Sequence, residues 1–223
     1  MIGLAARTLG RYLVPLAIVS AIVCVPFALL AYASPWPRDL PTANAALARA
    51  FAIAGAAWMA RFVVVGAAAP LARSLVANAP LSQPRALLAA AGNALRMAVP
   101  CLAAIAAVLV GGLALVLPAL ALVVLLSLTG ASTERGMPAP LADSVAVVRA
   151  HWQPVAAIVA VMLIVDVALA LAAWKLFAVP LAKKLKPEQW ATYGNVARVV
   201  VLGVLATTPV FAALLAAVHA RRR

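Results

Sequence analysis

The feature that most constrains this chain is a series of long apolar runs that carry almost no charged side chains. Hydrophobic residues make up 67% of the 223 residues, whereas a soluble domain is about 45–50% apolar. A helix needs about 20 apolar residues to cross a bilayer core about 30 Å thick. The runs therefore predict an all-α, polytopic membrane helix bundle that forms a single integral membrane domain over residues 1–223.

We expect about six transmembrane helices from these runs. They are predicted at Tyr12–Ala33, Ala46–Pro70, Met97–Val110, Gly112–Gly130, Trp152–Trp174 and Val196–Val218. The third and fourth spans form a tight hairpin at Gly111 and Gly112, and each arm is short for a full crossing at about 1.5 Å per residue. The first span follows Arg7 and Arg11 like a signal peptide, but its length favours a retained helix.

Prolines inside the first and last spans predict bends in those helices. Pro15 and Pro26 lie within the first span, and Pro209 follows two threonines in the last. Such bends are tolerated in a bilayer because neighbouring groups bond to the carbonyl oxygens that proline leaves without a donor.

Two connecting segments, Pro84–Met97 and Pro140–Trp152, are predicted to be short amphipathic helices in the membrane interface. The first places leucines and alanine on one side (Leu87, Leu88, Ala91, Leu95) and polar residues on the other (Arg85, Asn93, Arg96). The second places apolar residues at helical spacing (Leu141, Val145, Val148, Trp152). The alternative is that both segments are the first turns of longer transmembrane helices.

The residues around these two segments also resemble each other. Residues 96–108 align without a gap on residues 149–161, with six of the thirteen positions identical. This alignment predicts a parallel repeat of residues 46–110 and 112–176, flanked by the spans at 12–33 and 196–218.

The chain is strongly basic, with 18 Lys and Arg against five acids and a net charge of +13. Because the basic residues lie mostly at the ends of apolar runs, we expect them to contact anionic lipid headgroups rather than nucleic acid. The expected contact residues are Arg73, Arg85, Arg96, Arg149, Arg221, Arg222 and Arg223. Trp36, Trp152 and Trp174 are the expected interfacial anchors.

The distribution of basic residues predicts the orientation of the chain. With the N-terminus inside, ten Lys and Arg lie beside the inner span ends and seven beside the outer ends. This bias favours a multi-pass protein of the bacterial inner membrane with both termini in the cytoplasm. The lysines at 183, 184 and 186 oppose it.

Arg61 and Asp166 are the two charged residues deep inside apolar runs. A charge at the centre of a membrane helix costs about 2.5–3.5 kcal/mol on insertion scales. We expect the two residues to form an ion pair between the second and fifth predicted spans. The alternatives are that Arg61 extends toward the interface while Asp166 is protonated, or that the pair handles protons or substrate.

The sequence contains no catalytic or cofactor-binding motif. Cys24 and Cys101 lie in apolar runs and are expected to be buried hydrophobic residues. His151 is expected at the interface and His219 among the lipid headgroups, and neither has metal-ligand spacing to other candidates. We therefore expect no enzyme activity, no cofactor and no metal.

One stretch, residues 115–152, carries a family pattern. Leu117-Pro118 lies in an apolar span, Glu134 and Gly136 follow in a loop, and a second segment contains Ala142, Ser144, Val147, Arg149, His151 and Trp152. This pattern resembles that of bacterial six-span proteins related to the membrane domain of glycerophosphodiester phosphodiesterases. The chain departs from it at Ala150, where glycine is usual, and at residues 141–144. The resemblance implies a membrane module without the catalytic domain.

These features favour a non-enzymatic structural or accessory module of the inner membrane that assembles with anionic lipid, a membrane-protein partner or further copies of itself. The alternative is a permease-like subunit of a transporter, which the predicted repeat and the intramembrane charges support.

Overall fold

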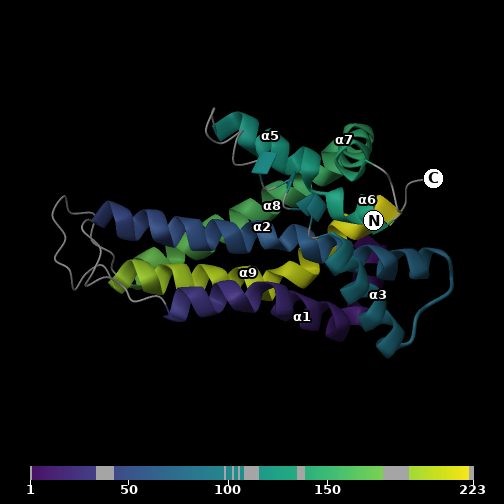
Figure 1. Ribbon diagram of the computed structural model, residues 1–223, viewed down its shortest axis with the longest axis horizontal. Helices are drawn as coiled ribbons and strands as arrows, with labels where there is room; N and C mark the ends of the chain where they lie inside the picture. Colours follow the sequence, from purple (N-terminus) through teal and green to yellow (C-terminus); the bar gives the residue numbers. More distant parts are fainter. Residues whose placement is uncertain are drawn as a thin grey trace. The chain divides into compact units, whose positions relative to one another are not determined.

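The computed structural model describes residues 2–33, 43–97, 99–101, 103–104, 106–107, 116–134, 139–177 and 191–220. All regular secondary structure in these ranges is α-helical, which confirms the predicted class. The helices are α1 (Ile2–Ala33), α2 (Ala43–Val76), α3 (Gln83–Arg96), α5 (Val116–Leu126), α6 (Thr129–Glu134), α7 (Pro140–Ala150), α8 (Trp152–Leu176) and α9 (Ala191–Ala220) (Figure 1).

Within the described ranges, four helices are long and apolar enough to cross a membrane, where the sequence predicted six. These stretches are Ile2–Tyr32, Ala52–Val76, Trp152–Leu176 and Gly194–Ala220. They correspond to the predicted first, second, fifth and sixth spans, although α2 continues through Pro70 to Val76. Much of the predicted third span, Met97–Val110, lies outside the described residues.

The predicted fourth span, Gly112–Gly130, is wrong as a single helix. α5 ends at Leu126, residues 127 and 128 form a turn, and α6 begins at Thr129. The hydroxyls of Ser127, Thr129 and Ser144 donate to the carbonyl oxygens of Val124, Leu126 and Leu125 at 2.8, 2.8 and 2.7 Å. Hydroxyl side chains that bond to nearby carbonyls compete with the helical pattern. These three hydrogen bonds therefore satisfy the last carbonyl oxygens of α5, so that the helix can end inside the protein.

The described helices belong to two compact units. The first is formed within Met1–Val23, Arg61–Val161 and Thr208–Arg223, and the second within Cys24–Ala60 and Met162–Thr207. Helices α1, α2, α8 and α9 contribute residues to both units. The predictions of one domain and of an internal repeat stay predictions.

The core of the second unit consists of small and β-branched side chains. Ala31, Ala57, Val201 and Val204 are buried there, and Phe27, Ala28, Ile53 and Val200 pack against them. Gly203 in α9 allows a close approach to α8, because a Cβ at this position would lie 2.6 Å from Leu169 Cδ1. Small residues at helix contacts are typical of membrane bundles, where packing rather than water exclusion holds helices together.

In the first unit, α3 and α7 are the two short helices that the sequence predicted. His151 has φ −131° and ψ 39°, so α7 is separate from α8 and is not the first turn of a longer helix. α6 packs against α7 and α3, and α5 packs against α7 (Figure 1).

The side of α3 that packs against the protein is the one opposite the leucines. Ala86, Ala90 and Asn93 are buried, whereas Leu88 and Leu95 are 73% and 80% exposed. The sequence placed Asn93 on the side of α3 opposite the leucines, as the structure does, but it did not predict that Asn93 is buried with a partner on α2. The leucines project from the opposite side of α3, away from the packed face.

Two glycines allow α2 and α6 to approach each other in this unit. A Cβ built on Gly66 would lie 2.8 Å from the carbonyl oxygen of Gly130, and a Cβ on Gly130 would lie 2.9 Å from that of Phe62. Both added atoms would also collide with the end of the Met97 side chain. The buried Met97 therefore fills the space that the two missing side chains leave open.

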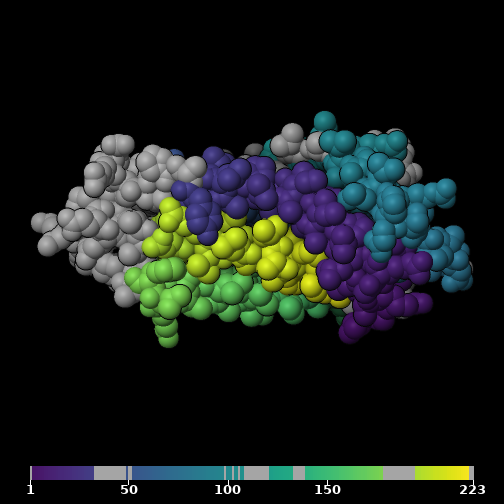
Figure 2. All heavy atoms as spheres, turned by 90° about the horizontal axis from the view of Figure 1, so that it is seen from below, coloured from purple at the N-terminus to yellow at the C-terminus, as the bar shows by residue number. Residues whose placement is uncertain are grey.

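The N-terminal half of α1 is kinked one turn before Pro15, as the sequence predicted. Tyr12 has φ −122° and ψ 23°, outside the helical region. Its buried hydroxyl accepts a hydrogen bond from the N–H of Leu81 at 2.8 Å and lies 3.1 Å from Ser74 Oγ. These contacts hold the end of α2 and the loop before α3 beside α1. Figure 2 shows α1, in purple, and the blue-teal segment that includes α3 at the surface.

Candidate functional site

The junction of α2 and α3 is built around a proline. Pro70 lies inside α2 and has no N–H, so the carbonyl of Gly66 lacks its normal helical donor. Asn93 Nδ2 donates to that oxygen at 2.7 Å. Gln83 Nε2 likewise donates at 2.6 Å to the carbonyl of Arg11, four residues before Pro15. Both amide side chains of α3 thus bond to carbonyls that a proline leaves without a donor.

A groove lies beside this junction. It has a volume of about 280 Å³ and is lined by Pro70, Leu88, Ala89, Gly92, Asn93 and Arg96. Four of its six lining residues carry no polar side chain, and Arg96 is the one charged residue among the six. A Cβ added to Gly92 would meet no atom within 4 Å, so the groove is open at this position.

Asp166 is buried in the second unit, with 8% of its surface exposed. Its carboxylate accepts a hydrogen bond of 3.0 Å from Trp58 Nε1, which joins α8 to α2. The sequence reasoning missed Trp58, although tryptophan is a donor that usually finds a partner when buried.

Arg61 is buried in the first unit, with 1% of its surface exposed. Its guanidinium carbon lies 5.4 Å from the centre of the Phe211 ring, within the range of a cation–π contact. Phe211 belongs to α9, so this contact joins α2 to α9. The burial of both charges agrees with their expected inward orientation. Because Arg61 and Asp166 belong to different compact units, their ion pair stays a prediction.

The arginines and tryptophans predicted at the membrane surface differ in how far they are exposed. Arg85, Arg96 and Arg149 are exposed, Arg73 is partly buried, and Arg221, Arg222, Arg223 and Trp36 lie outside the described residues. Trp152 is exposed and Trp174 is partly buried. Their roles as lipid contacts and interfacial anchors stay predictions.

The expectation for His219 was wrong. This histidine is buried, with 1% of its surface exposed, and its Nε2 lies 4.0 Å from Asp143 Oδ2. The C-terminal end of α9 therefore faces α7 within the first unit rather than a lipid headgroup layer. Asp143, in the first turn of α7, lies far from His219 in the sequence, so no local pattern indicated that the two residues meet.

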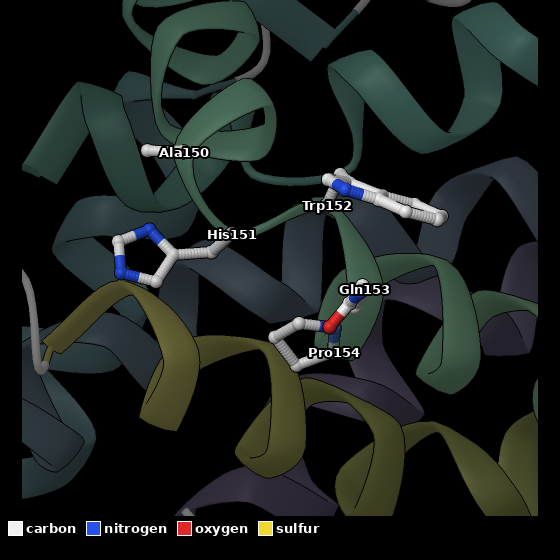
Figure 3. A pocket seen from close by; sticks show the side chains of 5 residues that line it. All are labelled: Ala150, His151, Trp152, Gln153 and Pro154. Atoms are coloured by element: carbon white, nitrogen blue, oxygen red, sulfur yellow. The ribbon is translucent and has the colours of Figure 1, made fainter.

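The break between α7 and α8 forms a surface hollow of about 340 Å³ lined by Ala150, His151, Trp152, Gln153 and Pro154. Figure 3 shows the rings of His151 and Trp152 pointing to opposite sides of the break. His151 Nδ1 lies 3.4 Å from the carbonyl oxygen of Val147. Because the five residues are consecutive and their two rings diverge, the hollow does not bring chemical groups together around a ligand.

Arg198 is a further residue that the sequence reasoning did not single out. Its guanidinium donates to the carbonyl oxygens of Ala31 and Tyr32 at 3.1 and 3.4 Å, and it lies 5.1 Å from the centre of the Tyr32 ring. It therefore satisfies the last turn of α1, where a cation is also favoured by the helix dipole.

The described ranges contain no group of three or more His, Cys, Asp or Glu residues that could hold a metal ion. Cys24 and Cys101 are buried, as predicted.

The length and composition of the four long helices indicate a helical membrane protein. Comparisons of the chain with family models, with curated proteins and with solved structures gave no match.

Proposed function

We propose that this chain is a non-enzymatic structural or accessory module of the bacterial inner membrane that assembles with anionic lipid. The observation that carries the proposal is the large apolar surface of α8. Only 22% of its most apolar stretch is buried, and Val161, Ile164, Val167 and Leu171 are all exposed. Such a surface needs lipid or another apolar helix around it.

The exposed arginines support the lipid part of the proposal. Arg85, Arg96 and Arg149 lie on the short helices α3 and α7 rather than on the four long apolar helices. A basic residue near an anionic membrane surface gains about 1 kcal/mol. The proposed orientation places these helices, and both chain termini, on the cytoplasmic side.

The proposal includes the resemblance to bacterial six-span proteins related to the membrane domain of glycerophosphodiester phosphodiesterases. Two residues of that pattern, Ser144 and Val147, are buried on α7, and Ser144 bonds to the end of α5. Their burial supports a structural reason for the pattern in this chain. We also propose that the module assembles with a membrane-protein partner or with further copies of itself.

Reconstitution tests the lipid assembly. The purified protein is transferred into vesicles of phosphatidylcholine with or without phosphatidylglycerol, and retained lipid is counted by native mass spectrometry. We expect preferential retention of phosphatidylglycerol, reduced when Arg85, Arg96 and Arg149 are replaced together by glutamine. Equal retention of both lipids would contradict the proposal.

The second candidate function is a permease-like subunit, favoured by the burial of Asp166 and Arg61 within long apolar helices. Under this alternative, Asp166→Asn abolishes uptake of a substrate while expression and helicity stay unchanged. A structural module tolerates the same substitution.

A further inference from the structure

The groove between α2 and α3 has the features of a binding site for one phospholipid. Its volume of about 280 Å³ is slightly below the range of about 300–1,000 Å³ that encloses a small ligand. It can therefore hold a part of a larger molecule whose remainder lies outside. A lipid acyl chain that runs from a groove into the bilayer is such a molecule.

The faces of α3 divide in a way that matches a lipid. Ala86, Ala90 and Asn93 face the protein, and Leu88 and Leu95 project from the opposite side. Because positions 85 and 96 are 11 residues apart, about three turns, Arg85 and Arg96 lie on one flank between these faces. One helix thus presents an apolar surface for acyl chains and, beside it, cationic groups for a headgroup.

Charge complementarity identifies the headgroup as anionic. The sequence of α3 contains two arginines and no acid. Arg96 lines the groove together with apolar residues, and the polar Asn93 is already bonded to Gly66. A phosphate group at Arg96 would leave the acyl chain next to Leu88 and over Gly92. A soluble phosphate ion would leave this apolar surface uncovered.

We infer that the α2–α3 groove binds a single anionic phospholipid, with its phosphate at Arg96 and one acyl chain over Gly92. This inference rests on the proposed membrane location and adds a defined lipid position. Gly92 has a specific role here, because any larger side chain would occupy the space of the acyl chain without disturbing the protein.

Photolabelling tests this position. The full chain is reconstituted in phosphatidylcholine vesicles with a trace of phosphatidylglycerol that carries a diazirine on an acyl chain, and labelled peptides are identified by mass spectrometry. We expect labelling of α3 and the end of α2 in the wild type and its loss in Gly92→Leu. Gly55→Leu is the matched control, because Gly55 also has open space around it but does not line the groove.

Two further variants test the headgroup and stay informative if Gly92→Leu does not fold. Arg96→Gln should lower labelling of the groove about fivefold, the ratio expected for about 1 kcal/mol. Arg85→Gln, on the same flank but outside the groove lining, should lower it less. A phosphatidylcholine probe should label the groove weakly, and excess inorganic phosphate should not displace the anionic lipid probe.

The outcomes separate the two proposals. If Gly92→Leu and Arg96→Gln label like the wild type, or if inorganic phosphate displaces the probe, the groove site is wrong while the membrane module stands. If the probe labels neither the groove nor the exposed face of α8, the membrane proposal itself fails.

Discussion

Asn93 of α3 donates a hydrogen bond of 2.7 Å to the carbonyl oxygen of Gly66 in α2. This oxygen would normally accept from the residue four positions later, but that residue is Pro70. The same relationship joins Gln83 to Arg11 ahead of Pro15. The bond to Gly66 is buried, where a carbonyl without a donor is unfavourable, whereas the bond to Arg11 is exposed. The polar residues of α3 therefore hold this short helix at the two points where the long helices need a donor.

Replacing Asn93 tests the coupling to Pro70. We expect Asn93→Leu to lower the free energy of unfolding by about 0.6–2 kcal/mol, because the Gly66 carbonyl loses its donor. Pro70→Ala restores a backbone N–H within α2. The double variant should therefore lose less stability than Asn93→Leu alone, as measured by unfolding in detergent micelles. Additive losses would show that the amide and the proline act independently.

Gly66→Ala should destabilise the contact of α2 with α6. The added Cβ would meet the side chain of Met97 and the backbone oxygen of Gly130, which cannot move aside cheaply. We expect a loss of about 1–3 kcal/mol in the free energy of unfolding. Gly92→Ala is the control, and it should be neutral or stabilising because its site is open and alanine favours helix. Equal effects at both glycines would contradict the described packing.

The hydrogen bond from Trp58 to Asp166 predicts an order among variants of the acid. Asp166→Asn keeps an oxygen that can accept from Trp58 Nε1, whereas Asp166→Leu removes it. Asp166→Leu should therefore lower the thermal unfolding midpoint more than Asp166→Asn. Trp58→Phe should cancel the difference between the two, and a persisting difference would show that Trp58 is not the relevant donor.

The predicted Arg61–Asp166 ion pair has its own test. Removal of one partner of a buried pair costs about 3–5 kcal/mol, because the other charge stays buried. We expect Arg61→Leu and Asp166→Leu each to reduce the amount of folded protein in the membrane strongly, and the double replacement to reduce it less. If the double replacement is as damaging as either single change, the pair does not exist.

The sequence predicted those elements that depend on local pattern. The spans beginning at Trp152 and near Val196 agree closely with the described apolar stretches, because a long apolar run bounded by polar residues determines its own length. The kink before Pro15 and the separate helix α7 were also predictable, since proline and a polar segment act locally.

The failures involve contacts between distant residues. Asn93 looked like a polar surface residue because its partner, the Gly66 carbonyl, becomes available only through Pro70 on another helix. His219 looked like part of the basic tail, although Asp143 lies beside it in the fold. The break after Leu126 arises from hydroxyls that a count of apolar residues does not register.

The central claim is that lipid surrounds the exposed apolar faces of the four long helices. Spin labels attached to introduced cysteines test this claim. Four labels replace one exposed residue on each long helix (Ile22, Ala56, Ile164 and Leu202), and a fifth replaces Ala79 in the loop before α3. In phosphatidylglycerol-containing vesicles, we predict that power saturation shows the four helix labels accessible to oxygen and shielded from a water-soluble nickel complex, with the label at Ala79 accessible to nickel. Helix labels as accessible to nickel as the loop label would contradict the account.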